Sequence, residues 1–327
     1  MKEQRWPIWI ILVFVMMVLI IALEIWQKKD VGPVLVIAAG PQGSTAANIA
    51  GKMTFLLNRE MSTHHFTSKE TAGSHESLEG IDKGLCNFAL ASAEEGYKAL
   101  VEVPPSRKKK DRKARLMVRL FESYVLLIVL KYSPVTEPSD LSGKRVAIGN
   151  PNSTTAFAAK RYFQAINIWS DFTPIYVGHE LALQELISGS VDAVWLLSGI
   201  PCEAVRKINR SEPLRLISPW NGVPVTPASR QFYQDYPFYD ISFLPPNSYR
   251  DQKERLFTIG METLWFADRD LDSETVRQVL EIIYSEQNLE QIRYDYPVAQ
   301  EMRLSKTLSR MTLPMHPGAV TFLREHL

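Results

Sequence analysis

Two segments of the chain share one local pattern, in which a buried strand runs through a turn of small residues into a helix. Val34–Ala39 leads into a helical segment at Thr45–Leu57, and Arg145–Ile148 leads into another at Thr154–Ile166. The first N–H groups of a helix lack partners within it and carry partial positive charge, so a helix start can hold a carboxylate or phosphate. We therefore expect two α/β lobes that hold one polar ligand between them. The competing interpretation is that such units recur in any α/β protein.

Composition limits the class of protein. The 327 residues suffice for one large or two ordinary cores, and 46% hydrophobic with 22% charged residues is typical of a globular chain. The formal net charge is +1, without a sustained basic face, so we expect no nucleic-acid partner. Cys86 and Cys202 are too few for a disulfide framework or a structural zinc site. We predict two buried free thiols in different lobes.

The N-terminal segment is predicted to anchor the chain. Ile8–Ile25 is apolar apart from Glu24, and about 20 such residues span a bilayer. Aromatic rings suited to the membrane interface lie at its margins, at Trp6, Trp9 and Trp26. We expect residues 1–30 to be an uncleaved, single-pass helix in the bacterial inner (cytoplasmic) membrane, with the globular domain in the periplasm or otherwise outside the cytoplasm. A cleavable signal peptide is the alternative, although its apolar core is usually shorter.

After residue 30, predicted strands and helices alternate. This order predicts a parallel sheet covered by helices, with ligands at the carboxyl ends of the strands. The expected strands are Val34–Ala39, His65–Lys69, Phe88–Ala91, Tyr124–Leu130, Arg145–Ile148, Thr173–Val177, Asp192–Leu197, Leu214–Ser218 and Thr258–Ala267. We predict that Tyr124–Leu130 and Thr258–Ala267 cross between the lobes. Residues 31–122 with 228–327 then form a discontinuous first lobe, and residues 123–227 form the second.

Several short segments along this order are characteristic of one family. They are Ala39-Gly40 with Gly43-Ser44-Thr45, Thr71-Ala-Gly-Ser74 with Glu76, Phe88-Ala-Leu-Ala-Ser92, Leu141-Ser-Gly-Lys-Arg-Val-Ala-Ile-Gly149 with Pro151 and Ser153-Thr154, Ser188-Gly-Ser-Val-Asp-Ala193, Gly199-Ile-Pro201 and His316-Pro-Gly-Ala319. From Val34 to its end the chain resembles the TAXI (TRAP-associated extracytoplasmic immunogenic) solute-binding proteins of tripartite ATP-independent periplasmic (TRAP) transporters.

The resemblance implies a two-lobe periplasmic-binding-protein clamshell of type II-like topology, preceded here by the transmembrane helix. It implies capture of a small anionic solute, an amino acid or organic acid such as glutamate, for TRAP-type permease subunits in the membrane, with no cofactor or metal. The implied ligand-binding residues are Gly43, Ser44, Thr45, Thr71, Ser74, Ser92, Asn150, Ser153, Thr154, Thr155, Ser198 and Gly199. Hydroxyl and backbone N–H groups can surround a carboxylate without burying an unpaired protein charge.

Two other functions compete with transport. In place of the second glycine and the tyrosines usual in the family's first loop, the chain has Thr45-Ala-Ala-Asn48. A membrane-tethered ligand sensor or assembly partner with a degenerate cleft and no transport role therefore stays open. An enzyme is not expected, because the chain lacks a P-loop, a GxGxxG and a Gly-x-Ser-x-Gly motif. His64 and His65, as strand neighbours, point to opposite faces and do not form a joint metal site.

Overall fold

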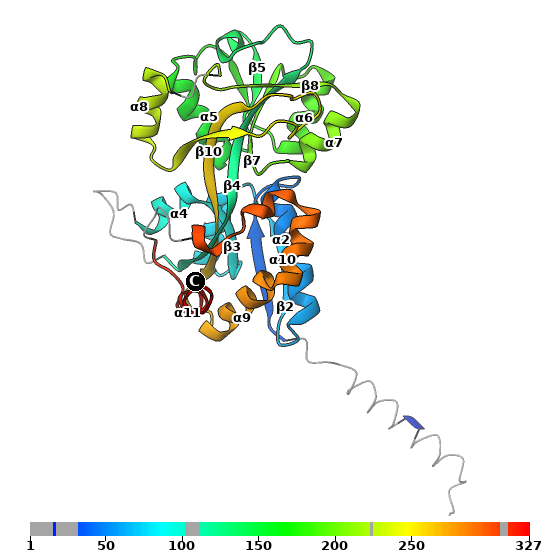
Figure 1. The fold of residues 1–327 in the computed structure, drawn as a ribbon, viewed down its shortest axis with the longest axis vertical. Coiled ribbons are helices and arrows are strands. Elements are labelled where there is room, and N and C mark those ends of the chain that lie inside the picture. The colour runs from blue at the N-terminus through cyan, green and yellow to red at the C-terminus, as the bar shows by residue number, and fades with distance from the viewer. Residues whose placement is uncertain (1–15, 18–31, 102–111, 223–224, 308–312) are drawn as a thin grey trace, which may run out of the picture.

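The computed structural model describes residues 16–17, 32–101, 112–222, 225–307 and 313–327. The predicted membrane anchor at residues 1–30 lies outside this part of the chain, apart from Met16 and Met17. Within the described ranges, no helix combines the length and the apolar character that a membrane span requires. Figure 1 shows two lobes, one above the other, joined by long strands that run between them.

The first lobe begins with parallel strands and their helices. Its N-terminal elements are β1 (Val34–Ala39), α2 (Thr45–Glu60), β2 (His65–Glu70), α3 (Ser74–Asp82), β3 (Phe88–Ser92) and α4 (Ala93–Leu100). Strand β1 lies between β2 and β3 and is parallel to both. Helix α2 buries Ile49, Met53 and Leu56, whose spacing places them on one face, and this face joins the core around Ile37.

C-terminal elements complete this lobe. They are α9 (Ser273–Tyr284), α10 (Glu286–Asp295), α11 (Pro317–His326) and the short 3-10 helices η2 (Pro297–Glu301) and η3 (Leu304–Lys306). Figure 1 shows α10 beside α2, although they are far apart in the sequence. Buried Val276 and Val279 of α9 belong to the same core as α2, so the first lobe is built from both ends of the chain.

The second lobe repeats the alternation. Its elements are η1 (Pro138–Leu141), β5 (Arg145–Ala147), α5 (Thr154–Ala165), β6 (Thr173–Ile175), α6 (His179–Ser188), β7 (Ala193–Ser198), α7 (Glu203–Ser211), β8 (Leu214–Ile217), α8 (Pro227–Asp235) and β9 (Tyr239–Leu244). Aromatic rings fill one side of its core: the ring centroid of Tyr162 lies 4.9 Å from that of Trp195 and 5.0 Å from that of Trp220. Such contacts add to the stabilisation from burial of the rings themselves.

Two long antiparallel strands join the lobes. Strands β4 (Ala114–Leu130) and β10 (Leu256–Asp268) pair from Ala114 with Asp268 to Tyr124 with Gly260. They lie at the centre of one continuous sheet of order β2-β1-β3-β10-β4-β7-β5-β6. Strand β10 pairs with β3 in the first lobe, whereas β4 pairs with β7 in the second. Any rotation of one lobe against the other therefore acts on these two strands.

Several details differ from the sequence-based expectation. Strand β4 begins at Ala114, well before the expected Tyr124. The sequence did not indicate this half of the strand because Arg115 and Arg119 interrupt its apolar residues, although Arg119 is buried in the structure. Helix α8 packs on α5, and its Phe232 is part of the second lobe's core, so the chain re-enters the first lobe along β10 and not at residue 228.

Both cysteines are free and buried, as predicted. Cys86 packs with the first-lobe elements α3 and β3, and Cys202 packs with the second-lobe elements α6 and β7. No disulfide links the lobes through this pair.

Candidate functional site

The N-termini of five helices surround one cavity between the lobes. Helices α2, α3 and α4 of the first lobe and α5 and α6 of the second all contribute residues of their first turns or caps. The cavity measures about 70 Å³. Its lining consists of Gly40, Pro41, Ser44, Ala46, Ala72, Gly73, Ser74, Leu90, Ala91, Ser92, Ser123, Ser153, Thr154, Thr155, His179, Leu197, Met261, Glu262 and Thr263. The crossing strands β4 and β10 form the remaining wall.

Serine caps explain why three of these helices begin where they do. The side chains of Ser44, Ser92 and Ser153 accept hydrogen bonds from the third backbone N–H of α2, α4 and α5, at 3.2, 3.3 and 3.1 Å. Each cap satisfies one N–H group, and the other first-turn N–H groups have no partner within their own helix. These groups and the helix dipoles give the cavity wall a partial positive charge.

No lysine or arginine of the described chain lines this cavity. The ionisable side chains of the lining are Glu262 and His179. The Glu262 carboxylate pairs with Arg119, whose Nε lies 3.0 Å away, while another Arg119 nitrogen lies 3.0 Å from Glu301. Arg119 therefore serves two carboxylates. The partial charges that favour an anion in the cavity come from the helix starts and not from a protein cation.

His179 is the most unusual group of the lining. It is the first residue of α6, is only 2% exposed, and neither ring nitrogen has a hydrogen-bond partner within the described residues. Burial lowers the pKa of His179 from 6.5 to about 4, so the ring is neutral at pH 7. An unpartnered buried polar group costs about 1–3 kcal/mol, which a ligand that hydrogen-bonds to it recovers.

The lobes also contact each other directly beside the cavity. Thr45 Oγ1 of α2 lies 3.1 Å from Ser198 Oγ and donates a hydrogen bond of 3.0 Å to the carbonyl oxygen of Gly199. Ser92 Oγ lies 3.4 Å from Thr154 Oγ1, so the starts of α4 and α5 touch. A Cβ atom on Gly199 would lie 2.8 Å from Thr45 Cγ2, which explains why a glycine is required for this approach.

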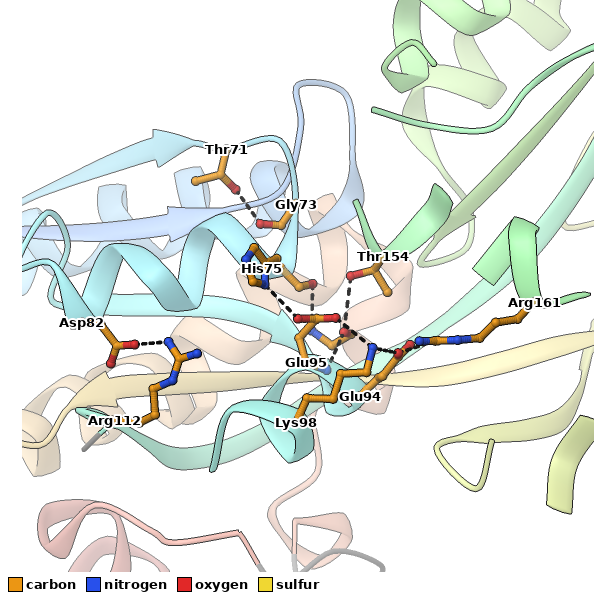
Figure 2. Close-up of polar contacts among 12 residues, drawn as sticks. Thr71, Gly73, His75, Asp82, Glu94, Glu95, Lys98, Arg112, Thr154 and Arg161 are labelled. Atoms are coloured by element: carbon orange, nitrogen blue, oxygen red, sulfur yellow. Dashed lines mark hydrogen bonds and ion pairs between the residues drawn. The ribbon is translucent and has the colours of Figure 1, made fainter. Parts of the chain in front are cut away.

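A buried ion pair joins the same helices. Glu94 of α4 is fully buried and pairs with Arg161 of α5 and with Lys98 of its own helix, as Figure 2 shows. The hydroxyl of Tyr239 donates to the same carboxylate at 3.1 Å. Because Arg161 and Tyr239 belong to the second lobe, this pair holds the lobes together at the edge of the cavity.

The structure divides the twelve residues implied by the resemblance into two groups. Those that line the cavity are Ser44, Ser74, Ser92, Ser153, Thr154 and Thr155. The others lie outside the lining: Gly43, Thr45, Thr71, Asn150, Ser198 and Gly199.

The second group serves other contacts. Thr45, Ser198 and Gly199 form the direct contact between lobes described above. The carbonyl oxygen of Gly43 accepts from Cys202 Sγ at 3.9 Å, also across the lobes. Thr71 Oγ1 stays within the first lobe, 2.8 Å from Ser77 Oγ.

Asn150 and the polar side chains of the lining that were not predicted are associated with α6 or the crossing strands. Asn150 lies against Gly178, the N-cap of α6. His179, Ser123, Glu262 and Thr263 line the cavity without having been predicted. The signal for His179 is present in the sequence, because Gly178-His179 follows β6 in the same strand–turn–helix pattern as the other helix starts. Ser123, Glu262 and Thr263 lie within long strands, where no local pattern marks a site.

Comparison with known proteins adds a family and a fold. The chain matches the model of the NMT1-like family over residues 37–326. A solved structure from Bordetella bronchiseptica RB50 is 14% identical, with a TM-score of 0.51, and the match covers 89% of this chain and 82% of that one. A putative L-cystine ABC transporter from Listeria monocytogenes is 14% identical, with a TM-score of 0.49, over 83% of this chain and 98% of that one.

A third structure is the periplasmic aliphatic sulphonate binding protein from Escherichia coli. It is 14% identical, with a TM-score of 0.45, and the match covers 90% of each chain. The names of the last two structures are those of a transporter and a binding protein. At 14% identity, the likeness to the Bordetella structure is one of fold alone, and this fold is an α/β fold with two lobes. Because the family match spans most of its length, the chain belongs to the NMT1-like family.

Proposed function

We propose that the protein is an extracytoplasmic solute-binding protein that captures a small anionic solute, such as an amino or organic acid, between its lobes. The observation that carries this proposal is the convergence of five helix N-termini from both lobes on one cavity whose described lining contains no lysine or arginine. Helix starts stabilise an anion without the desolvation cost of burying a protein cation. A neutral or cationic solute gains nothing from such a wall.

Closure of the lobes follows from the same geometry. A carboxylate that lies between the starts of α4 and α5 receives hydrogen bonds from both lobes only when these helices are as close as Ser92 and Thr154 are here. The solute therefore favours the closed state over a state with separated lobes. The cavity of about 70 Å³ is below the usual range of small-molecule sites, roughly 300–1,000 Å³. A solute as large as glutamate requires a wider cavity than this conformation offers.

The transport system and the location complete the proposal. The segments that resemble TAXI proteins support a TRAP-type permease as the membrane partner. The apolar segment Ile8–Ile25 supports a single-pass anchor in the inner membrane, with the lobes on the periplasmic side. Such an anchor keeps the captured solute close to the permease. Of the site residues proposed from the sequence, six then act in the lining and Gly43, Thr45, Ser198 and Gly199 act in the contacts between the lobes. Thr71 and Asn150 make contacts within their own lobes.

A second candidate is a membrane-tethered sensor or assembly partner with a degenerate cleft and no transport role. Its supporting observation is that the lobes already meet directly through Thr45 and Ser198, with little space left between them. The two functions differ in one respect that can be measured. A transport protein binds its solute and passes it to a permease, whereas a partner with a degenerate cleft keeps its shape and binds no solute.

A thermal-shift screen of the full-length chain in detergent tests the proposal. The panel contains short monocarboxylates, dicarboxylates and amino acids, with neutral glycerol as the blank. A solute present at 100 times its Kd stabilises the folded state by about 2.7 kcal/mol, which raises the melting temperature. Thr154→Leu places an apolar side chain in the lining and removes a hydroxyl, so we expect this variant to lose the shift.

The matched control is Thr321→Leu, because Thr321 lies on the exposed face of α11, away from the cavity. It should keep the full shift. A solute that shifts wild-type protein and Thr154→Leu equally would show that binding occurs elsewhere. A panel without any shift would favour the partner with a degenerate cleft.

A further inference from the structure

Building on the proposed function, we infer that the solute is a short monocarboxylate and that the His179 side chain is one of the groups that bind it. Three observations point to this class of solute. They are the volume of the cavity, the charges in its lining and the unpartnered imidazole of His179.

The volume limits the length of the solute. A cavity of about 70 Å³ accommodates only a few water-sized groups, since a single water needs roughly 10–15 Å³ of this space. Acids of about two to four carbon atoms meet this limit, because each of their non-hydrogen atoms takes up about the space of one water-sized group. Longer acids require the helix starts of the two lobes to move apart, which breaks contacts such as the one between Ser92 and Thr154.

The charges in the lining limit the solute to one carboxylate. The helix starts favour one buried negative charge, but the described lining contains no side-chain cation that could pair with a second one. A second carboxylate would also share the cavity with Glu262, whose partner Arg119 is already divided between Glu262 and Glu301. Like charges at such short range oppose binding. Dicarboxylates such as succinate are therefore disfavoured by charge as well as by size.

The imidazole supplies the remaining interaction. A neutral histidine carries one N–H donor and one acceptor nitrogen, and in His179 both lack partners within the described residues. Burial is the cause of its lowered pKa, with no contribution from a neighbouring charged side chain, although Glu180 follows it on α6 and Glu262 lies across the cavity. A carboxylate oxygen in the cavity can accept the N–H of the ring. This bond forms only in the loaded protein, so it contributes directly to affinity.

Calorimetric titration of the full-length chain in detergent tests the inference. The short monocarboxylates are L-lactate and propionate. The larger probes are succinate, which is a dianion at pH 7, and L-glutamate, which is longer and carries two carboxylates. We expect the first two to bind at least about tenfold more tightly than the second two. His179→Phe keeps a ring of similar size but removes both nitrogens, and we expect it to weaken lactate binding by about tenfold or more without lowering the melting temperature.

A second variant and a control separate a binding role from a structural one. His179→Asn retains a hydrogen-bond donor, so it should bind lactate better than His179→Phe does. His65→Phe changes an exposed histidine at the start of β2 and should bind lactate as wild type does.

Three results would overturn the inference. If succinate or glutamate binds and neither monocarboxylate does, the class of solute is wrong while the proposed function stands. If none of the four anions binds, the inferred class of solute is wrong, and the thermal-shift panel described above decides whether the protein captures any anion. If His179→Phe and wild type bind lactate equally, His179 is not a binding residue.

Discussion

His179 contributes to the protein in opposite ways with and without a solute. Its ring is buried and unpartnered in the described structure, so it destabilises the empty protein by a cost that a bound solute removes. Solute-binding sites are places where such a cost is tolerated, because it becomes binding free energy. His316, which is also buried, differs in having a partner for one of its ring nitrogens, because its Nδ1 accepts from the N–H of Gly318 while its Nε2 has no partner within the described residues.

The pH dependence of stability tests the environment of His179. Its pKa is about 4 in the folded protein against an ordinary value of 6.5, so between these values the unfolded chain binds a proton that the folded chain does not. Stability is therefore lost as the pH falls from 6.5 toward 4, by roughly 3 kcal/mol for this group.

Urea unfolding at pH 7 and pH 4.5 measures this loss. His179→Phe lacks the titrating group, so we expect it to lose less stability over this interval than wild type does. An equal loss in the two proteins would show that the imidazole is solvated or paired.

At the residue scale, the serine caps of the helices could be predicted from the sequence, whereas the place of the His179 imidazole in the cavity lining was not predicted. Ser44 and Ser153 stand at the end of small-residue turns that follow apolar strands, and this pattern is local. His179 follows a strand of only three residues, which makes the same pattern weak. Glu262 has no local signal at all, since its place in the cavity depends on how β10 pairs with its neighbours.

At the scale of elements, close contact between the turn after β7 and the start of α2 decides how far the lobes can close. A Cβ atom at Gly199 would lie 2.8 Å from Thr45 Cγ2, 3.0 Å from Val298 Cγ2 and 3.1 Å from Phe121 Cε2. Thr45 and Val298 belong to the first lobe, whereas Gly199 belongs to the second. This glycine is therefore needed for closure and not for the fold of its own lobe.

The added methyl group of Gly199→Ala should keep the two lobes from closing fully. Overpacking of this kind costs about 1–3 kcal/mol in the closed state, so we expect affinity for lactate to fall about tenfold. Without solute the lobes can separate and relieve the overlap, so the melting temperature should fall by less than this cost implies.

Calorimetric titration and thermal melting of the same sample measure the two effects. Gly51→Ala is the control, because a Cβ atom there, in the middle of α2, meets nothing within 4 Å. This change should leave binding intact and stabilise the helix by up to about 1 kcal/mol. Equal affinity for lactate in Gly199→Ala and wild type would show that the added methyl group does not hinder closure.

Helices and strands with a regular hydrophobic pattern could be predicted from the sequence. Elements whose position depends on contacts with residues far away in the chain could not. The alternation of strands and helices predicts the order of elements in both lobes. The N-terminal half of β4 was missed because Arg119 interrupts its apolar residues, and this arginine is tolerated through its pairs with Glu262 and Glu301. Helix α8 carries no local sign of its lobe, since its position depends on the aromatic cluster around Phe232 and Tyr239.

At the scale of the whole molecule, ion pairing between the lobes sets the balance of open and closed states. Glu94 is buried between α4 and α5, with Arg161 across the boundary and Lys98 on its own helix. Removal of one partner of a buried pair leaves charge that is poorly compensated, at a cost of roughly 3–5 kcal/mol when no other partner remains. If Arg161 is removed, Lys98 still pairs with Glu94 and reduces this cost. Opening of the lobes reduces the cost further, because it exposes the Glu94 carboxylate to water.

Arg161→Met should therefore shift the empty protein toward an open state. Small-angle scattering of the full-length chain in detergent, matched for the detergent contribution, should show a larger radius of gyration for this variant. Arg145→Met is the control, because the pair of Arg145 with Asp192 lies on the exposed surface within the second lobe. Identical scattering from Arg161→Met and wild type would show that the ion pair does not hold the lobes closed.

The arrangement of the two lobes and of the cavity between them could be predicted from the sequence only in part. Two lobes and two crossing strands could be inferred from the order of strands and helices. The small size of the cavity could not, because it results from contacts between Thr45, Ser198 and their neighbours that lie far apart in the chain.

A crystal structure of the full-length chain grown with L-lactate tests whether both lobes bind one carboxylate. We expect one lactate in the cavity, with its carboxylate within hydrogen-bond distance of first-turn N–H groups of α5 and of at least one of α2, α3 and α4. Lactate bound to one lobe alone would contradict shared binding. So would lactate in the larger surface cavity of about 370 Å³ beside Tyr132 and Arg215, with the space between the helix starts left unchanged.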